Sequence, residues 1–264
     1  MIRPYAILER VRERKPLVHH ITNWVTIYDC ANITRAFGAL PVMAHAAEEV
    51  EEMAGIADAL VLNIGTLTPP LVESMLKAGK AANRKGIPIV LDAVGAGATR
   101  LRTQSTLRLL ESLDIGVLKG NAGEIASIAG AKAEVKGVES VNVKGDIKEI
   151  ACRLAGREKN VIAVTGREDL VTDGKKTYRI GNGHAMMGSI VGTGCMAASV
   201  VGAFCAVEKD YAKAAACALS CFGIAGELAG VKSRGPGSFK ERFYDAVYNL
   251  DGKTIESMKK VYEE

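Results

Sequence analysis

The chain has 264 residues, of which 48% are hydrophobic and 24% are charged, a composition that excludes a disordered or collagen-like protein. Its net charge is +4, and its 34 basic and 30 acidic residues are scattered along the sequence, which argues against a nucleic-acid-binding protein. The six cysteines include no Cys-x-x-Cys pair, so we expect free thiols in a reducing compartment and no zinc site.

Neither of two candidate segments is expected to be a targeting or membrane segment. Residues Met1–Lys15 lack the uninterrupted apolar core of a signal peptide and are predicted to form a short surface helix. The uncharged stretch Ile190–Val207 contains Gly192 and Ser199 among its apolar residues, which favours a buried helix over a membrane span. We therefore expect a cytoplasmic protein that binds neither a membrane nor nucleic acid.

Short apolar runs alternate with longer stretches of helical periodicity. The predicted strands are Leu17–Ile21, Ala59–Ile64, Ile87–Leu91, Val117–Lys119 and Val161–Val164. The predicted helices are Trp24–Phe37, Pro69–Lys85 and Ala122–Ile128, each followed closely by a glycine that favours helix termination. This α/β alternation predicts a mainly parallel sheet with helices on both faces.

The last third of the chain has a different pattern. Asp173 and Gly174 predict the turn of a hairpin over Leu170–Ile180, at an edge of the sheet. After Gly194 no clear strand is expected, and the predicted helices are Cys195–Val207, Tyr211–Leu228, Phe239–Asn249 and Asp251–Tyr262. No linker or repeat interrupts the sequence, so residues 1–264 are predicted to form a single domain.

Polar residues and glycines follow each predicted strand. Ligands of open parallel sheets bind beyond the carboxyl ends of the strands, so these positions are the candidates for a functional site. They are Asn23, Asn63, Gly65, Asp92, Asn121, Glu124, Thr165, Gly166 and the run Gly192–Cys195.

The run Gly188–Cys195 precedes an apolar helix, where small residues leave backbone N–H groups exposed to bind an anion. It has neither the Gly-Lys-Ser/Thr of a P-loop nor the setting of a dinucleotide fingerprint. The alternative is a glycine-rich turn that allows close helix packing. Cys195 would lie at the start of the helix, where the helix dipole lowers the pKa of a thiol.

Asp92 and Glu124 place two carboxylates near this anion site. They suit a magnesium ion held through water, because Mg²⁺ keeps much of its hydration and binds phosphate oxygens. Alternatively, Asp92 caps the following loop and Glu124 caps the first turn of a helix. Met43 belongs to the apolar segment Pro41–Ala44, which suits either a ligand pocket or core packing.

Taken together, eight segments in order resemble the hydroxyethylthiazole kinase family of the ribokinase-like superfamily. They are Pro16–Asn23, Pro41–Ala44, Asn63–Leu67, Leu91–Gly97, Lys119–Glu124, Val164–Gly166, Gly192–Cys195 and Gly235–Phe239. The resemblance extends along most of the chain and implies a ribokinase-like three-layer α/β/α fold with a mainly parallel central sheet. It also implies that ATP phosphorylates the hydroxyl of 4-methyl-5-(2-hydroxyethyl)thiazole, giving the thiazole phosphate and ADP for thiamin diphosphate biosynthesis or salvage.

The resemblance further implies ligand contacts for individual residues. Met43, Asn23 and Gly192 would contact the thiazole, and Lys119 and Thr165 would contact ATP. The family is also homotrimeric with active sites between subunits, so Met43 and Asn23 would serve a site that a neighbouring subunit completes.

Metal and catalytic roles follow from the same resemblance. Asp92 and Glu124 would organise Mg²⁺. The backbone of the catalytic run, formed by Gly192, Thr193, Gly194 and Cys195, would stabilise charge on the transferring phosphoryl group.

Two positions differ from related patterns. The family often has arginine where this chain has Lys119, and lysine offers a point charge in place of a planar fork. The wider superfamily has an aspartate base at the position of Cys195, whereas a thiol is a weak base for an alcohol unless it is ionised. Cys195 is therefore expected either to assist proton transfer or to position the hydroxyl. The alternative functions are a nucleotide-dependent NAD(P)H-hydrate dehydratase, which should keep the aspartate, and a noncatalytic thiazole- or nucleotide-binding protein.

Overall fold

The computed structural model describes residues 2–131, 133–136, 139–143 and 145–264, so Met1, which the predicted N-terminal helix includes, lies outside the described residues. In this part of the chain nine strands form one sheet. From one edge to the other they are β11 (Val261–Glu263), β10 (Thr177–Ile180), β9 (Asp169–Thr172), β8 (Val161–Thr165), β5 (Val117–Asn121), β4 (Ile89–Asp92), β3 (Ala59–Asn63), β1 (Leu17–Ile21) and β2 (Leu40–Val42). Strands β8 to β2 in this order are parallel, and β9, β10 and β11 are each antiparallel to their neighbours.

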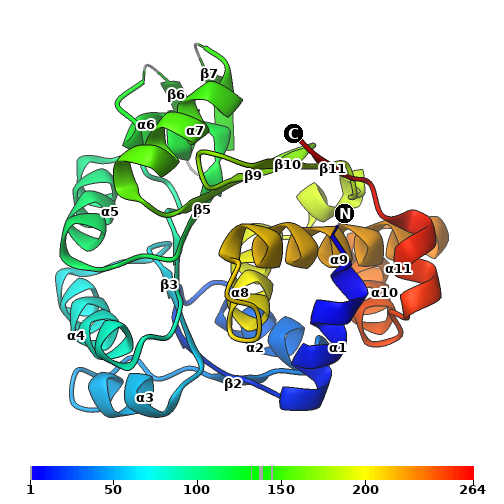
Figure 1. The fold of residues 1–264 in the computed structure, drawn as a ribbon, viewed down its shortest axis with the longest axis horizontal. Helices are drawn as coiled ribbons and strands as arrows, with labels where there is room; N and C mark the ends of the chain where they lie inside the picture. The colour runs from blue at the N-terminus through cyan, green and yellow to red at the C-terminus, as the bar shows by residue number, and fades with distance from the viewer. Residues whose placement is uncertain (1, 132, 137–138, 144) are drawn as a thin grey trace.

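Helices cover both faces of the sheet (Figure 1). On one side lie α3 (Val50–Ile56), α4 (Pro69–Lys85), α5 (Arg100–Ser112), α6 (Ala122–Ile128) and α7 (Ile147–Glu158). On the other side lie α1 (Pro4–Arg14), α2 (Ile27–Ala36), α8 (Thr193–Cys205), α9 (Tyr211–Lys232), α10 (Pro236–Tyr248) and α11 (Gly252–Met258). A separate antiparallel pair, β6 (Ala133–Lys136) and β7 (Glu139–Val143), stands beside α6 and α7. The predicted three-layer α/β/α architecture is confirmed.

The alternation of side chains along each strand builds two hydrophobic cores. In β3, Leu60 and Leu62 join the core beneath α4, whereas Val61 joins the core beneath α8 and α9. Successive strand residues point to opposite faces, so a strand that is covered on both sides is apolar throughout. Helix α8 approaches β3 closely, because a side chain at Gly202 would lie 2.6 Å from Val61 Cγ2. This close packing fixes where α8 begins relative to the strand ends.

Helix α9 is long and apolar enough to cross a membrane by length and composition. It is instead a core helix, because 78% of its most apolar 18-residue window is buried within the protein. The stretch Ile190–Val207 likewise contains the mostly buried helix α8, as predicted.

The five predicted strands are all present, and that of Leu17–Ile21 has the predicted bounds. The hairpin over Leu170–Ile180 is also present as β9 and β10. Its predicted place at the edge is wrong, because β11 pairs with β10 and occupies that edge. The expectation of no strand after Gly194 is therefore also wrong, and the last helix ends at Met258.

Two further differences have simple physical reasons. Strand β2 was not predicted as a strand, because it has only three half-buried residues at the other edge of the sheet. The N-terminal helix is present, but it is amphipathic and does not lie loosely on the surface. Its residues Ile7, Leu8 and Val11 are buried, and it packs against α9.

Candidate active site

The parallel register of β3, β4 and β5 brings three polar side chains together at the carboxyl ends of these strands. Asn63 lies opposite Asp92, and Asp92 lies opposite Lys119. The predicted grouping of polar residues at the carboxyl ends of the strands is thus present.

The centre of this group is a buried ion pair. Lys119 Nζ lies 2.9 Å from Asp92 Oδ1, and the two side chains are only 5% and 0% exposed. Burial opposes the charge of Lys119, yet the carboxylates of Asp92 and Glu124 outweigh it and hold the pKa of Lys119 above its usual range. The second oxygen of Asp92 accepts a hydrogen bond of 2.7 Å from Asn63 Nδ2. Asp92 therefore pairs with Lys119 and Asn63 and is no simple loop cap.

Two amides connect the ion pair to Cys195. Since Asn63 Nδ2 donates to Asp92, its Oδ1 is the acceptor, and Asn23 Nδ2 donates to it at 3.0 Å. Asn23 Nδ2 also donates to Cys195 Sγ at 3.3 Å. The Oδ1 of Asn23 in turn accepts from the backbone N–H of Thr26 at 3.0 Å, which fixes the amide. Cys195 Sγ is thus the acceptor in its bond with Asn23, at the end of a chain of hydrogen bonds that begins at Asp92.

The first turn of α8 meets the ion pair. Gly192 precedes the helix with φ +96°, a left-handed conformation that favours glycine, and a side chain there would lie 2.6 Å from Thr26 Cγ2. A side chain at Gly194 would lie 3.2 Å from Lys119 Nζ. The ammonium therefore lies against the N-terminal turn, where it adds a full positive charge to the exposed backbone N–H groups. An ammonium beside helix-start N–H groups suits a bound anion, and we call Lys119 and this turn the anion site.

The pKa expected for Cys195 is wrong in direction. Burial is the largest cause that raises the pKa of the Cys195 thiol, and the Asp92 carboxylate raises it further. Lys119 opposes this shift only in part. A helix start alone would lower the pKa of a thiol, but burial raises that of Cys195.

Glu124 is held by backbone N–H groups. Its Oε1 accepts from Gly95 N at 2.6 Å and its Oε2 accepts from Asn121 N at 2.7 Å, while Asn121 Oδ1 accepts from Glu124 N. The latter two bonds form a capping box at the start of α6, so the capping alternative is correct for Glu124. Burial raises the pKa of Glu124 to about 7 despite the nearby Lys119.

The donor set suits a magnesium ion bound chiefly by other groups. Among the described residues no three His, Cys, Asp or Glu side chains gather to form a metal cage. Two buried carboxylates nevertheless share one ammonium, and this excess of negative charge favours an added cation. Mg²⁺ commonly takes one or two carboxylates and completes its shell with water and phosphate oxygens. Asp92 and Glu124 fit that arrangement.

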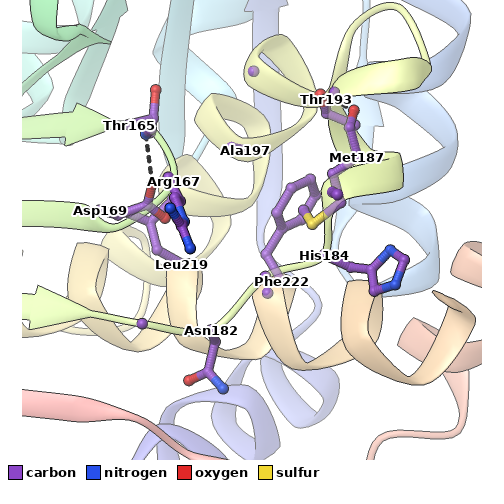
Figure 2. Close-up of a pocket in the computed structure, with 17 residues that line it drawn as sticks. Thr165, Arg167, Asp169, Asn182, His184, Met187, Thr193, Ala197, Leu219 and Phe222 are labelled. Atoms are coloured by element: carbon purple, nitrogen blue, oxygen red, sulfur yellow. Dashed lines mark hydrogen bonds between the residues drawn. The ribbon is translucent and has the colours of Figure 1, made fainter. Parts of the chain in front are cut away.

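A cavity of about 650 Å³ opens beside the anion site. Thr165, Gly166, Gly188, Thr193 and Gly194 are the residues singled out from the sequence that line it. Figure 2 shows Thr165 and Asp169 on one side of the cavity and Thr193 and Met187 on the other. The remaining lining residues were not predicted, and they include Asp169, Asn182, His184, Met187, Leu219 and Phe222. Nothing in the sequence marked them, because most belong to an irregular segment or to the apolar face of α9.

Met43 is the predicted site residue that stands apart. It follows β2, is half-buried and does not line the cavity. Strand β2 is parallel to β1, and the chain leaves β1 toward Asn23. Met43 therefore lies at the carboxyl ends of the strands, as does Asn23, the other side chain predicted to contact the thiazole. Its role stays a prediction.

The fold is that of ribokinase-like proteins. A ribokinase-like superfamily protein of Enterococcus faecalis shares this fold, with a TM-score of 0.65 over 92% of this chain and 93% of that chain at 14% identity. A hydroxyethylthiazole kinase of Methanosarcina mazei is 57% identical over 97% of this chain and 98% of its own length. The structure of a hydroxyethylthiazole kinase protein from Pyrococcus horikoshii OT3 has a TM-score of 0.91 at 44% identity, covering 99% of this chain and 98% of that chain.

The model of the hydroxyethylthiazole kinase family matches residues 8–253, and the chain belongs to this family. These findings do not favour the dehydratase or the noncatalytic binding protein.

The ion pair gives a stability prediction. We expect Asp92→Asn to lower the free energy of unfolding by about 3 kcal/mol, because it leaves the Lys119 ammonium buried without an anionic partner. Urea denaturation at pH 7 measures this change. The double variant Asp92→Asn/Lys119→Met should recover most of the loss, since no unpaired charge remains. As a control, Glu73→Gln breaks the exposed pair with Arg108 and should leave stability unchanged. An equal loss in the single and the double variant would contradict the explanation.

Proposed function

We propose that the protein transfers the γ-phosphoryl group of ATP to the hydroxyl of 4-methyl-5-(2-hydroxyethyl)thiazole, giving the thiazole phosphate and ADP. Family membership supports the choice of reaction. The observation that carries it in the structure is the contact between the Lys119 ammonium and the first turn of α8, at the mouth of the cavity. Phosphoryl transfer depends mainly on positioning and on charge stabilisation, and this contact supplies both.

The cavity suits the nucleotide. Its polar end holds Thr165, Thr193 and Gly194, where phosphates would meet backbone N–H groups and Lys119. Its apolar end holds Leu219 and Phe222, which would pack against the base and ribose. As a point charge, Lys119 binds a phosphate oxygen without a fixed bidentate geometry.

The thiazole alcohol would bind across the first turn of α8 from the cavity. Asn23, Gly192 and Cys195 face that region, and Met43 lies at the same edge of the sheet. The hydrogen bonds that Asn23 donates to Asn63 and to Cys195 would keep the thiol oriented toward the substrate hydroxyl. This places the acceptor hydroxyl and the transferring group on either side of one helix start.

Asp92 and Glu124 would hold Mg²⁺ through its water shell. When bound, the ion neutralises charge on the phosphate oxygens. The residues of the chain supply the rest: Lys119 balances the carboxylates, and the N–H groups of residues 193–195 stabilise negative charge on the transferring group.

We also propose that the protein is a cytoplasmic homotrimer with active sites between subunits. Trp24, Val25, Tyr28 and Val191 are 51%, 66%, 75% and 72% exposed, and all lie within a few residues of Asn23 or Gly192 in sequence. Large apolar side chains that gather on a surface beside a site suit burial by another subunit.

The kinase assay tests the proposed reaction. Protein incubated with ATP, Mg²⁺ and hydroxyethylthiazole should form the thiazole phosphate and ADP in equal amounts, as detected by mass spectrometry. Omission of any one component should abolish the thiazole phosphate. Folded protein that binds ADP but makes neither product would refute the substrate assignment.

The role of Cys195 has a separate test. Because its pKa is raised, a thiolate base would make turnover climb as pH rises toward that pKa, and Cys195→Ser would lose this climb. We expect instead that Cys195→Ser keeps the shape of the pH profile and loses at most about tenfold in kcat, since serine can still position the hydroxyl. A wild-type alkaline rise that is missing in the serine variant would assign Cys195 as the base.

The assembly is tested by light scattering after gel filtration. We expect the mass of three 27.9 kDa chains. Tyr28→Glu should dissociate the trimer and lower activity, because it places a charge within the exposed apolar cluster. A wild-type protein that is monomeric at assay concentrations and fully active would overturn the proposed assembly.

A further inference from the structure

Three glycines of α9 lie where the chain segment Asn182–Met187 packs against the helix. A side chain at Gly223 would lie 2.5 Å from the carbonyl oxygen of Asn182, and one at Gly230 would lie 2.5 Å from the His184 ring. A side chain at Gly226 would collide with Met187 Sδ. Residues three and four apart share a helix face, so these glycines form one groove in which the segment sits.

The same segment is a wall of the cavity. Asn182, His184 and Met187 line the cavity, together with Phe222 and Gly223 of α9. Figure 2 shows the segment passing Asn182, His184 and Met187 beside the helix that carries Phe222. The depth of the glycine groove therefore determines how far this wall projects into the cavity.

Hydrogen bonds to Glu227 hold the first residues of this segment, Asn182 and Gly183, in place. Glu227 Oε1 accepts hydrogen bonds from Asn182 Nδ2 at 3.1 Å, from Gly183 N at 3.0 Å and from Lys260 Nζ at 3.0 Å. Asn182 Oδ1 accepts from Ser220 Oγ and from Lys260 N. The end of the wall is held as well, because Thr193 Oγ1 donates to Met187 O at 2.9 Å. The main chain is tied at both ends, so the Met187 side chain is the part that can move.

We propose that Gly226 is a positioning residue for the nucleotide: by leaving room for the Met187 side chain to lie against α9, it sets the width of the nucleotide pocket. The inference rests on the proposed use of the cavity for ATP. A methyl group at position 226 would displace Met187 Sδ and Cγ, the latter at 3.1 Å, and the displaced side chain would enter the cavity. The anion site would keep its place, because the displaced atoms belong to the Met187 side chain, whereas Thr193 bonds to the main-chain carbonyl oxygen of Met187.

Gly226→Ala is the direct test. We expect the Kd for MgADP, measured by calorimetry, and the KM for ATP each to rise about tenfold, because overpacking forces a side chain out of its site. The KM for the thiazole alcohol and kcat at saturating ATP should stay within about twofold, since the reacting groups are not displaced. Gly156→Ala is the matched control, because it makes the same change in helix α7 with no atom within 4 Å of the added methyl group.

Combining Gly226→Ala with Met187→Ala tests whether Gly226 acts on nucleotide affinity through the Met187 side chain. If Gly226 acts through Met187, adding Gly226→Ala to Met187→Ala should change the Kd for MgADP by less than about twofold. This comparison also serves if Gly226→Ala alone is too unstable to purify, because the double variant has room for the methyl group.

Two results would overturn the proposal: ADP affinity of Gly226→Ala equal to that of wild type, or the same loss whether residue 187 is methionine or alanine. Wild-type protein that binds no ADP would instead refute the use of the cavity for the nucleotide.

Discussion

The buried pair of Lys119 and Asp92 is the interaction on which the site depends. Two charges that are almost fully enclosed are tolerated only when each has a partner and further hydrogen bonds, and Asn63 donates such a bond to Asp92. The requirement extends outward through Asn63 and Asn23 to Cys195. The register of three parallel strands and the position of one helix are therefore linked to the orientation of a single thiol.

Close packing at glycines also sets the position of α8 relative to the ion pair. Gly202 lets α8 lie directly on β3, Gly192 lets its first turn meet Thr26, and Gly194 leaves space for the Lys119 ammonium. A larger residue at any of these places would move the N–H groups away from the Lys119 ammonium, so that the two could no longer bind the same anion. The anion site thus consists of backbone N–H groups that glycines leave uncovered, together with Lys119. Among the described residues that form it, this lysine carries the only formal positive charge.

The strands and the strand-end residues could be predicted from the sequence, because buried parallel strands are short apolar runs and the residues after them have a fixed place in the fold. The wall of the cavity could not, since its position follows from the glycine groove of α9, which the sequence shows only as small residues in an apolar helix. The pKa of Cys195 was predicted in the wrong direction because a sequence shows a helix start but not the burial around it. The strand β11 was missed because it has only three residues, of which Tyr262 and Glu263 are exposed, and they carry no clear alternation.

The bonds behind the cavity wall have a consequence for the order of folding during synthesis. Gly181 N donates to Lys260 O, and Asn182 and Glu227 both bond to Lys260. A residue near the end of the chain therefore holds the cavity wall in place. The parallel strands and the two residues of the ion pair are complete once β8 has been made, and the anion site is complete once α8 follows, whereas the wall must wait for Lys260 to leave the ribosome. A nascent chain can therefore form its parallel strands and its anion site before it can close around a nucleotide, and a ligand would act late, on the final step of folding.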